Sequence, residues 1–355
     1  MYKPASKPDL LKRLQLELTQ VTGRIVMLLV LILACGHFAP GSEPLKPDFT
    51  KPFFEMQPVS GSMRVMTILW DPHRPTDLAP SREAIKQLMF GREHSLRGYY
   101  KENSLGKLHI ANAGIYGWYD ALKPADHYWG PLDEGDQDGD GWVNGHVEKW
   151  AEAILKVDAE IDFRQYDTNH DGVLEPRELA IHIVIPQNGP FGTNRVPAGR
   201  EAPEWEPLLV DGIRIPVIAE SYIGAPPDLS LVAHELAHLL LNAPDEYFPF
   251  RSDSAPGPFS LMDQNWYCAH LDPFLKLRAG WARPLFITES ATCRLGSVER
   301  TGQVLVLYDP ARSNSEYFLI ENRWPEDTYE AALPDKGLAI RSEERRVGKE
   351  CRSRW

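Results

Sequence analysis

Residues 228–247 read DLSLVAHELAHLLLNAPDEY, which places two histidines and a glutamate within a segment made largely of Leu, Val and Ala. Apolar residues on every side predict a buried helix, with Asp228 as its N-cap. A buried imidazole or carboxylate without a partner is strongly unfavourable. We therefore expect the three polar side chains to share a partner inside the protein.

The spacing of the two histidines predicts a metal site. His234 and His238 are four residues apart, so they lie on one face of a helix and can direct two ring nitrogens at one ion. Glu235 can reach the open coordination position without being a ligand. This is the H-E-x-x-H arrangement, in which zinc holds a water and the glutamate accepts its proton. It predicts peptide-bond hydrolysis with Glu235 as general base and then general acid.

A third ligand is expected directly after the helix, in NAPDEY, residues 242–247. Asn242 tolerates the left-handed conformation that ends many helices, and Pro244 prevents the helix from continuing. The chain can then fold back and present a carboxylate to the metal. We expect Asp245 to be this ligand, with Glu246 as the alternative.

Several other segments occur in the order found in one protein family. They are MRVMTILWD (63–71), SLRGYYKENSLGKLHIANAGIYGWY (95–119), an acidic loop, IDFRQYDTNHDG (161–172), HELAHLLLNAPDEY (234–247), FSLMDQ (259–264), HLDPFLKLRAGW (270–281) and EYFLIENR (316–323). Over roughly residues 63–340 the chain resembles the M6 metalloproteases, the immune inhibitor A family within the metzincin-like zincins.

This resemblance implies a zincin catalytic domain with a twisted mixed sheet, a metal-bearing helix and a C-terminal subdomain. Met262 matches the methionine of the Met-turn, which forms an apolar floor beneath the metal. The chain departs from the family pattern in two places: Leu241 stands where members have Gly, and Asp245 comes one residue later than the family's Asp.

The pattern of apolar residues predicts an α+β body followed by an all-β segment. Helices are expected at 81–91, 93–104, 146–161, from 228 onward and at 270–281. Strands are expected at 63–72, 107–121, 180–187, 284–290, 302–309 and 315–323, with a hairpin in 206–222 that turns at Asp211-Gly212.

Two acidic loops predict structural calcium. Residues 167–178, DTNHDGVLEPRE, fit the pattern D-x-[DN]-x-[DN]-G-x5-E. The expected ligands of the first loop are Asp167, Asn169, Asp171, the carbonyl of Val173 and Glu178, with Glu175 acting directly or through water. The expected ligands of the second loop are Asp136, Asp138, Asp140, the carbonyl of Trp142 and Asn144, completed by Asp133 or Glu148.

Composition narrows the class of protein further. The chain has 355 residues, of which 43% are hydrophobic, so it can bury a sizeable core. Its net charge of −12 argues against nucleic acid as a partner, because phosphate contacts need clustered Lys and Arg. We expect a monomer that acts on protein or peptide substrates.

The N-terminal region predicts export. An apolar run at 25–34 has the length of a signal-peptide core, and Ile32-Leu33-Ala34-Cys35 resembles a bacterial lipobox, with an ordinary signal peptide as the alternative. Membrane attachment is expected only through a lipid on Cys35. The expected segments are 1–35 signal peptide, 36–62 linker or short pro-segment, 63–283 catalytic domain with calcium loops, 284–340 start of a β-rich region and 341–355 artefact.

The last fifteen residues, RSEERRVGKECRSRW, look like the translation of a sequencing adaptor, so we expect the natural sequence to be replaced after Ile340. Cys351 belongs to this tail and Cys35 to the signal segment, so Cys268 and Cys293 remain as a pair in an exported protein. A disulfide between them is expected, with two separate buried thiols as the alternative.

Two rival functions fit the same residues. One is a non-catalytic, calcium-dependent surface or adhesion module on a zincin scaffold. The other is a zinc hydrolase that acts on a substrate other than a peptide. The endopeptidase is favoured because the sequence contains every residue type that peptide hydrolysis needs.

Overall fold

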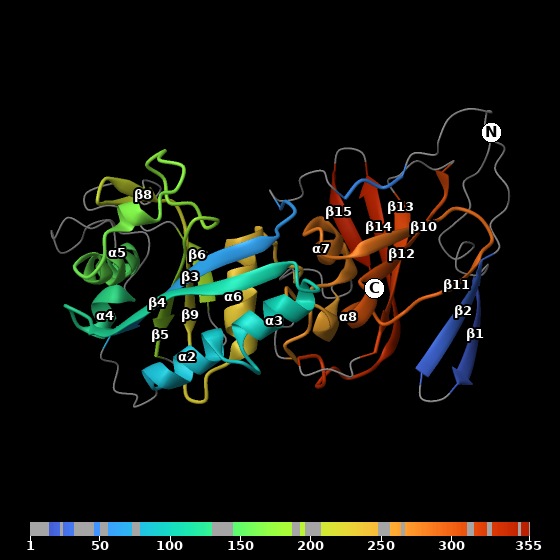
Figure 1. Ribbon diagram of the computed structural model, residues 1–355, viewed down its shortest axis with the longest axis horizontal. Coiled ribbons are helices and arrows are strands. Elements are labelled where there is room, and N and C mark those ends of the chain that lie inside the picture. Colours follow the sequence, from blue (N-terminus) through green and yellow to red (C-terminus); the bar gives the residue numbers. More distant parts are fainter. Residues whose placement is uncertain are drawn as a thin grey trace. The chain divides into compact units, whose positions relative to one another are not determined.

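The computed structural model describes most of the chain (Figure 1). The described residues are 14–21, 24–31, 46–49, 56–72, 79–129, 145–186, 192–195, 207–247, 256–263, 267–310, 316–324, 329–346 and 349–354. Contacts divide the chain into two units. The sheet unit comprises Val59–Glu102 and Gly106–Pro244; the C-terminal unit comprises Asp245–Trp355 with Met1–Pro58 and Asn103–Leu105. The division falls at Pro244, inside the segment 63–283 that the sequence predicts as one domain.

The sheet unit is built on a mixed five-stranded sheet. Its strand order is β4-β3-β5-β9-β6, where β4, β3, β5 and β9 are parallel and β6 is antiparallel. The strands are β3 (Gly61–Asp71), β4 (Leu108–Asp120), β5 (Ala180–Ile185), β6 (Gly192–Arg195) and β9 (Ile218–Tyr222). All six residues of β5 are buried, as expected for a central strand of a parallel sheet covered on both faces.

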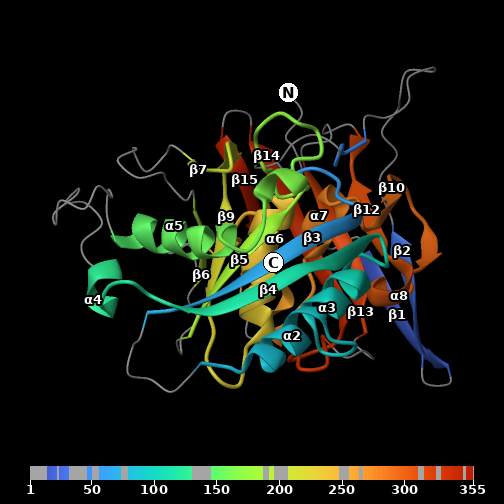
Figure 2. The same cartoon turned by 60° about the vertical axis from the view of Figure 1, so that its left-hand side comes forward.

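Helices cover both faces of this sheet. They are α2 (Arg82–Phe90), α3 (Leu96–Asn103), α4 (Ala125–Tyr128), α5 (Gly145–Asp158) and α6 (Leu229–Leu241), with the 3-10 turn η1 at Phe163–Gln165. In Figure 2, α5 lies on one side of β3 and β4, and α2 and α3 lie on the other. The chain steps from β3 to β4 in one direction and from β4 to β5 in the other, so right-handed crossovers place their helices on opposite faces.

Side-chain alternation along the strands explains the two layers. Met66, Ile68 and Trp70 of β3 join Ile181 and Ile183 of β5 in one apolar core with α5. The residues between them point to the opposite face. There α6 packs on β5, β9 and β6.

A small hairpin lies beside the α5 core. Strands β7 (Leu208–Val210) and β8 (Ile213–Ile215) pair antiparallel. Asp211 and Gly212 both have positive φ, 53° and 80°, which is the geometry of a tight hairpin turn. The turn predicted at Asp211-Gly212 is confirmed, whereas residues 218–222 leave the hairpin and enter the main sheet as β9.

The C-terminal unit is rich in β-structure. One sheet has the order β10-β12-β13-β14-β15 and a second has the order β1-β2-β11. The strands are β1 (Leu14–Val21), β2 (Arg24–Leu31), β10 (Arg283–Ile287), β11 (Thr292–Arg294), β12 (Gln303–Tyr308), β13 (Glu316–Arg323), β14 (Gly337–Arg346) and β15 (Lys349–Arg354). Its helices are η2 (Gly257–Phe259), α7 (Pro273–Arg278) and α8 (Val298–Thr301).

The mixed α/β class agrees with the α+β prediction, and the predicted helices and strands occur at the expected places. Besides the hairpin, a second expectation needs correction. The segment after residue 284 is not entirely β, because α8 forms a single helical turn that ends at Gly302 in the left-handed conformation. Within the described ranges, no helix is both long enough and apolar enough to cross a membrane.

The core of the sheet unit contains an uncharged histidine that is distinct from the H-E-x-x-H pair. His182 of β5 is fully buried, and its Nε2 lies 2.9 Å from the Ser221 hydroxyl on the neighbouring strand β9. Burial lowers the pKa of His182 from 6.5 to about 3. The unfolded chain therefore binds a proton at His182 across this pH range while the folded protein does not.

We expect His182 to make the protein less stable as the pH falls below 6.5. The unfolded state binds more protons in this window, so this residue removes about 1.4 kcal/mol of unfolding free energy per pH unit. Urea unfolding at pH 7, 6 and 5 should show a steeper loss for the wild type than for His182→Gln. Parallel pH profiles for the two proteins would contradict this expectation.

Candidate metal centre

Helix α6 begins and ends at the residues that the sequence predicts. The carboxylate of Asp228 accepts a hydrogen bond from the Ser230 N–H at 2.9 Å, which confirms Asp228 as the N-cap. Asn242 has φ 52° and ψ 35°, the left-handed conformation, and its N–H bonds to the His238 carbonyl at 3.0 Å. These caps fix the helix length and therefore the position of the two histidines.

The two imidazoles of α6 face each other. His234 Nε2 and His238 Nε2 lie 3.2 Å apart, and the ring planes are nearly perpendicular at 87°. His234 is 4% exposed and His238 is half-buried. The four-residue spacing thus brings one nitrogen of each ring to the same point.

The backbone after the helix fixes the tautomer of His238. Its Nδ1 lies 2.6 Å from the Ala243 carbonyl oxygen. A carbonyl only accepts, so Nδ1 carries the hydrogen and the lone pair is on Nε2. A metal-binding histidine commonly donates its other N–H in this way, which fixes the ring orientation.

Asp245 completes a group that could hold a metal ion. One ligand atom from each of His234, His238 and Asp245 lies within 4.8 Å of the other two. Among the residues that the structure describes, no other group of three or more His, Cys, Asp or Glu side chains has ligand atoms this close together. Glu235 follows the first histidine on the same helix and is 5% exposed.

Glu246, the alternative ligand, is placed differently. Its carboxylate accepts a hydrogen bond from the Ser260 hydroxyl. It also pairs at 2.6 Å with Arg341, the first residue of the terminal segment that is expected to be an artefact. Burial raises the pKa of Glu246, and the Arg341 charge opposes this shift. Of the two carboxylates that the sequence offers, the structure brings Asp245 to the histidines and directs Glu246 elsewhere.

Met262 is fully buried in the turn Ser260–Met262. Its carbonyl accepts a hydrogen bond from the Glu246 N–H at 2.8 Å, one residue after Asp245. The predicted Met-turn residue therefore lies on the segment that contacts the chain next to Asp245.

Sequence analysis did not identify three contributors to this site: Tyr100, Ala243 and Ser260. The Tyr100 hydroxyl donates to the Ala233 carbonyl at 2.7 Å, directly before His234, and so attaches α3 to α6. A signal was present for two of them, because Tyr100 and Ser260 lie in segments that carry the family resemblance. The Ala243 contribution comes from its backbone, which no side-chain pattern reveals.

The first acidic loop is closed on itself by its carboxylates. Asp167 accepts from the N–H groups of Asp171 and Gly172, at 3.3 and 3.1 Å. Glu178 accepts from the Thr168 N–H at 2.7 Å. Asn169 Oδ1 accepts from the Asp171 N–H at 2.9 Å. Gly172 has φ 78°, which permits the sharp turn that the pattern requires.

Strands of the sheet unit hold both ends of this loop. Arg64 of β3 donates from Nε to the Glu178 carbonyl at 3.0 Å, and its guanidinium carbon lies 5.2 Å from the centre of the Tyr166 ring. Val173 bridges to Arg214 of β8. The Val173 N–H donates to Asp171 Oδ1 at 2.8 Å, which bonds the backbone of Val173 within the loop.

The second acidic loop lies outside the described residues, which include neither Asp133 nor the ligands predicted at positions 136, 138, 140, 142 and 144. Glu148, the other residue considered for completing it, belongs to α5. Its carboxylate pairs with Lys123 Nζ at 3.1 Å and with His127 Nε2.

The structure corrects the predicted disulfide. Cys268 and Cys293 are both half-buried thiols and are not bonded to each other. Cys293 lies within β11, and burial raises its pKa. Separate thiols were the alternative that the sequence left open.

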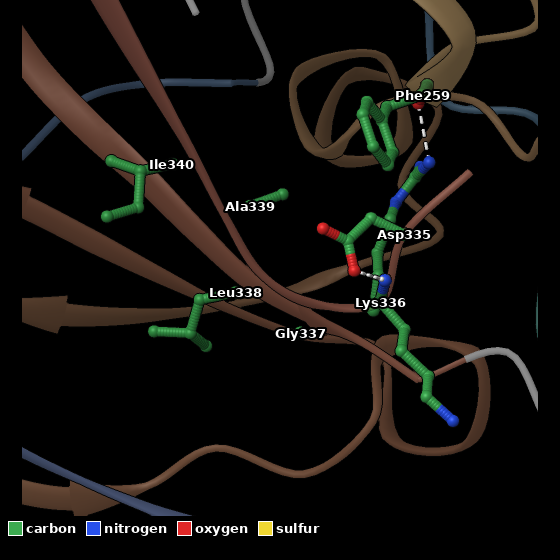
Figure 3. Close-up of a pocket in the computed structure, with 8 residues that line it drawn as sticks. Phe259, Asp335, Lys336, Gly337, Leu338, Ala339 and Ile340 are labelled. Atoms are coloured by element: carbon green, nitrogen blue, oxygen red, sulfur yellow. Dashed lines mark hydrogen bonds between the residues drawn. The ribbon is translucent and has the colours of Figure 1, made fainter. Parts of the chain in front are cut away.

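A pocket of ≈ 230 Å³ lies within the C-terminal unit (Figure 3). It is lined by Phe259, Arg323, Asp335, Lys336, Gly337, Leu338, Ala339 and Ile340. The Phe259 carbonyl accepts a hydrogen bond from the Arg323 guanidinium at 2.5 Å. The pocket does not include the His234, His238 and Asp245 group.

No protein-family model matches the chain, and a search of curated proteins finds no match. Any conclusion about function therefore rests on the residues and their geometry.

The N-cap of α6 gives a test of how the helix is fixed. Asp228→Ala should lower the free energy of unfolding by about 1 kcal/mol, because the Ser230 N–H loses its acceptor. Asp228→Asn is the matched control and should stay close to the wild type, since its amide oxygen also caps. Urea unfolding measures both variants, and equal losses would show that the charge of Asp228 matters more than its capping bond.

Proposed function

We propose that this protein is a zinc-dependent endopeptidase of the zincin type, with His234, His238 and Asp245 as ligands and Glu235 as the general base. The observation that carries the proposal is the group of these three ligand side chains, with Glu235 beside it on the same buried helix.

The donor set is the first support for zinc. Two imidazole nitrogens and one carboxylate oxygen are a common catalytic zinc set that leaves the fourth position open. Ligands about 2.1 Å from a tetrahedral ion lie about 3.4 Å apart. The observed Nε2–Nε2 distance of 3.2 Å is close to this value.

The second support for the proposal is the hydrogen bonding of His238 and the burial of Glu235. Zinc, when bound, polarises a substrate carbonyl and lowers the pKa of water to about 7. The Ala243 carbonyl holds the His238 ring in the tautomer that places a lone pair on Nε2. Glu235 accepts a proton from the attacking water and delivers it to the leaving amine. Its burial keeps competing bulk water away from the carboxylate.

We further propose that the loop 167–178 binds calcium and stabilises the fold. The support is its compact arrangement, in which Asp167, Asn169 and Asp171 turn toward the loop interior and Arg64 connects both ends to β3. A divalent cation would offset the repulsion between the loop carboxylates. Export, for which the apolar run at 25–34 is the support, fits a protein stabilised by calcium.

The leading alternative is a non-catalytic calcium-binding surface or adhesion module on the same scaffold. The calcium-like loop favours it, because that loop is organised independently of the histidine pair. A wild-type protein that binds zinc but cleaves no member of a broad peptide library would support the alternative. A zinc hydrolase of non-peptide substrates would also leave that library intact.

Glu235→Gln is the direct test of the endopeptidase. It should lower kcat/KM on a cleaved peptide by about 10²–10⁴-fold, because the amide cannot accept the water proton. Zinc content by elemental analysis should not change, since Glu235 is not a ligand. Glu83→Gln on α2 is the matched control and should keep full activity. Full caseinolytic activity in Glu235→Gln would contradict the proposal.

Calcium should raise the melting temperature through the loop 167–178. A ligand present at 100 times its Kd stabilises the folded state by about 2.7 kcal/mol. Asp167→Asn should remove most of the calcium-dependent shift at this loop and leave the zinc content unchanged. The exposed Asp126→Asn should retain the shift. Identical melting curves with calcium and with chelator would count against a calcium role.

A further inference from the structure

The two adjacent carboxylates after α6 have different partners. Asp245 is exposed at the surface and lies with the histidines. The side chain of Glu246 is only 7% exposed and turns to the segment Ser260–Met262. The two adjacent carboxylates therefore lie in different surroundings, one with the histidine pair and the other with the Ser260–Met262 turn.

Glu246 contacts the Ser260–Met262 turn through a closed ring of hydrogen bonds. The Glu246 N–H donates to the Met262 carbonyl at 2.8 Å. The Met262 N–H donates to the Ser260 hydroxyl oxygen at 3.3 Å, and the Ser260 hydroxyl donates to the Glu246 carboxylate. Ser260 and Met262 are fully buried, so these bonds are shielded from water and reinforce one another. We call this ring the Glu246 clasp.

The turn that receives the clasp is itself fixed in the C-terminal unit. The Leu261 N–H donates to the His270 carbonyl at 3.2 Å. Arg323 of β13 is buried and donates to the Phe259 carbonyl at 2.5 Å and to the Leu271 carbonyl at 3.3 Å. Arg323 also pairs with Glu321 at 2.7 Å. The Ser260–Met262 turn is therefore attached to a strand, not to a loose loop.

We propose that the Glu246 clasp positions Asp245 for metal binding, and that Glu246 is a positioning residue and not a ligand. The proposal rests on the zinc site proposed above. Asp245 is exposed, and the clasp holds both the backbone N–H and the carboxylate of the residue that follows it. The clasp thus lowers the conformational entropy that Asp245 would otherwise lose on binding the ion.

The first experiment removes the clasp without touching a ligand. Ser260→Ala deletes the hydroxyl that Glu246 accepts from, and it should weaken zinc binding about 10–100-fold. Zinc affinity is measured by competition with a chromophoric chelator, and the visible spectrum of the cobalt-loaded protein reports the ligand geometry. A changed cobalt spectrum is expected.

A matched control separates this effect from general loss of stability. The Ser297 hydroxyl also donates to a buried glutamate carboxylate, that of Glu299, in the same unit. Ser297→Ala should lower the melting temperature by an amount similar to Ser260→Ala and leave zinc affinity and the cobalt spectrum unchanged. Equal zinc affinities in the two variants would overturn the proposal.

The second experiment distinguishes the two carboxylates and covers the case in which Ser260→Ala fails to fold. Asp245→Asn should weaken zinc binding more than Glu246→Gln, whose amide oxygen still accepts from Ser260. A larger loss in Glu246→Gln would make Glu246 the ligand and overturn the proposal. A wild-type chain that binds no zinc overturns the proposed function together with the clasp, whereas tight wild-type binding with unaffected clasp variants overturns the clasp alone.

Discussion

The hydrogen bond from His238 Nδ1 to the Ala243 carbonyl is the interaction on which the site depends. It fixes the tautomer and the orientation of one imidazole, and it holds the chain that has just left α6 close to the helix end. Asn242 makes this approach feasible because its left-handed backbone reverses the chain within one residue. A single polar contact therefore couples the direction of the His238 ring to the path of the segment that brings Asp245.

Hydrogen bonds to neighbouring residues and elements hold both helix α6 and the loop 167–178 in place. The Asp228 cap fixes the start of α6, and the Tyr100 hydroxyl attaches its middle to α3. The loop 167–178 follows the same principle, since Arg64 connects its ends to β3. Sites held by side chains on helices and strands keep their geometry better than sites on unsupported loops.

Local patterns in the sequence predicted the elements and the histidine pair well. The spacing of His234 and His238, the caps of α6 and the turn at Asp211-Gly212 each depend on residues close together in the chain. The disulfide could not be judged in this way, because two cysteines 25 positions apart bond only if the fold brings them together in the required geometry.

The sequence by itself determined that a buried helix carries two histidines on one face and a glutamate directly after the first of them, since helical periodicity and burial follow from neighbouring residues. Only the tertiary structure decided which following carboxylate lies with those histidines. Asp245 and Glu246 have similar chemistry and adjacent positions, so nothing local separates them. Their difference comes from contacts with residues that are more than a dozen positions away in the chain. Ser260 and Met262 form hydrogen bonds with Glu246, whereas Asp245 lies with His234 and His238.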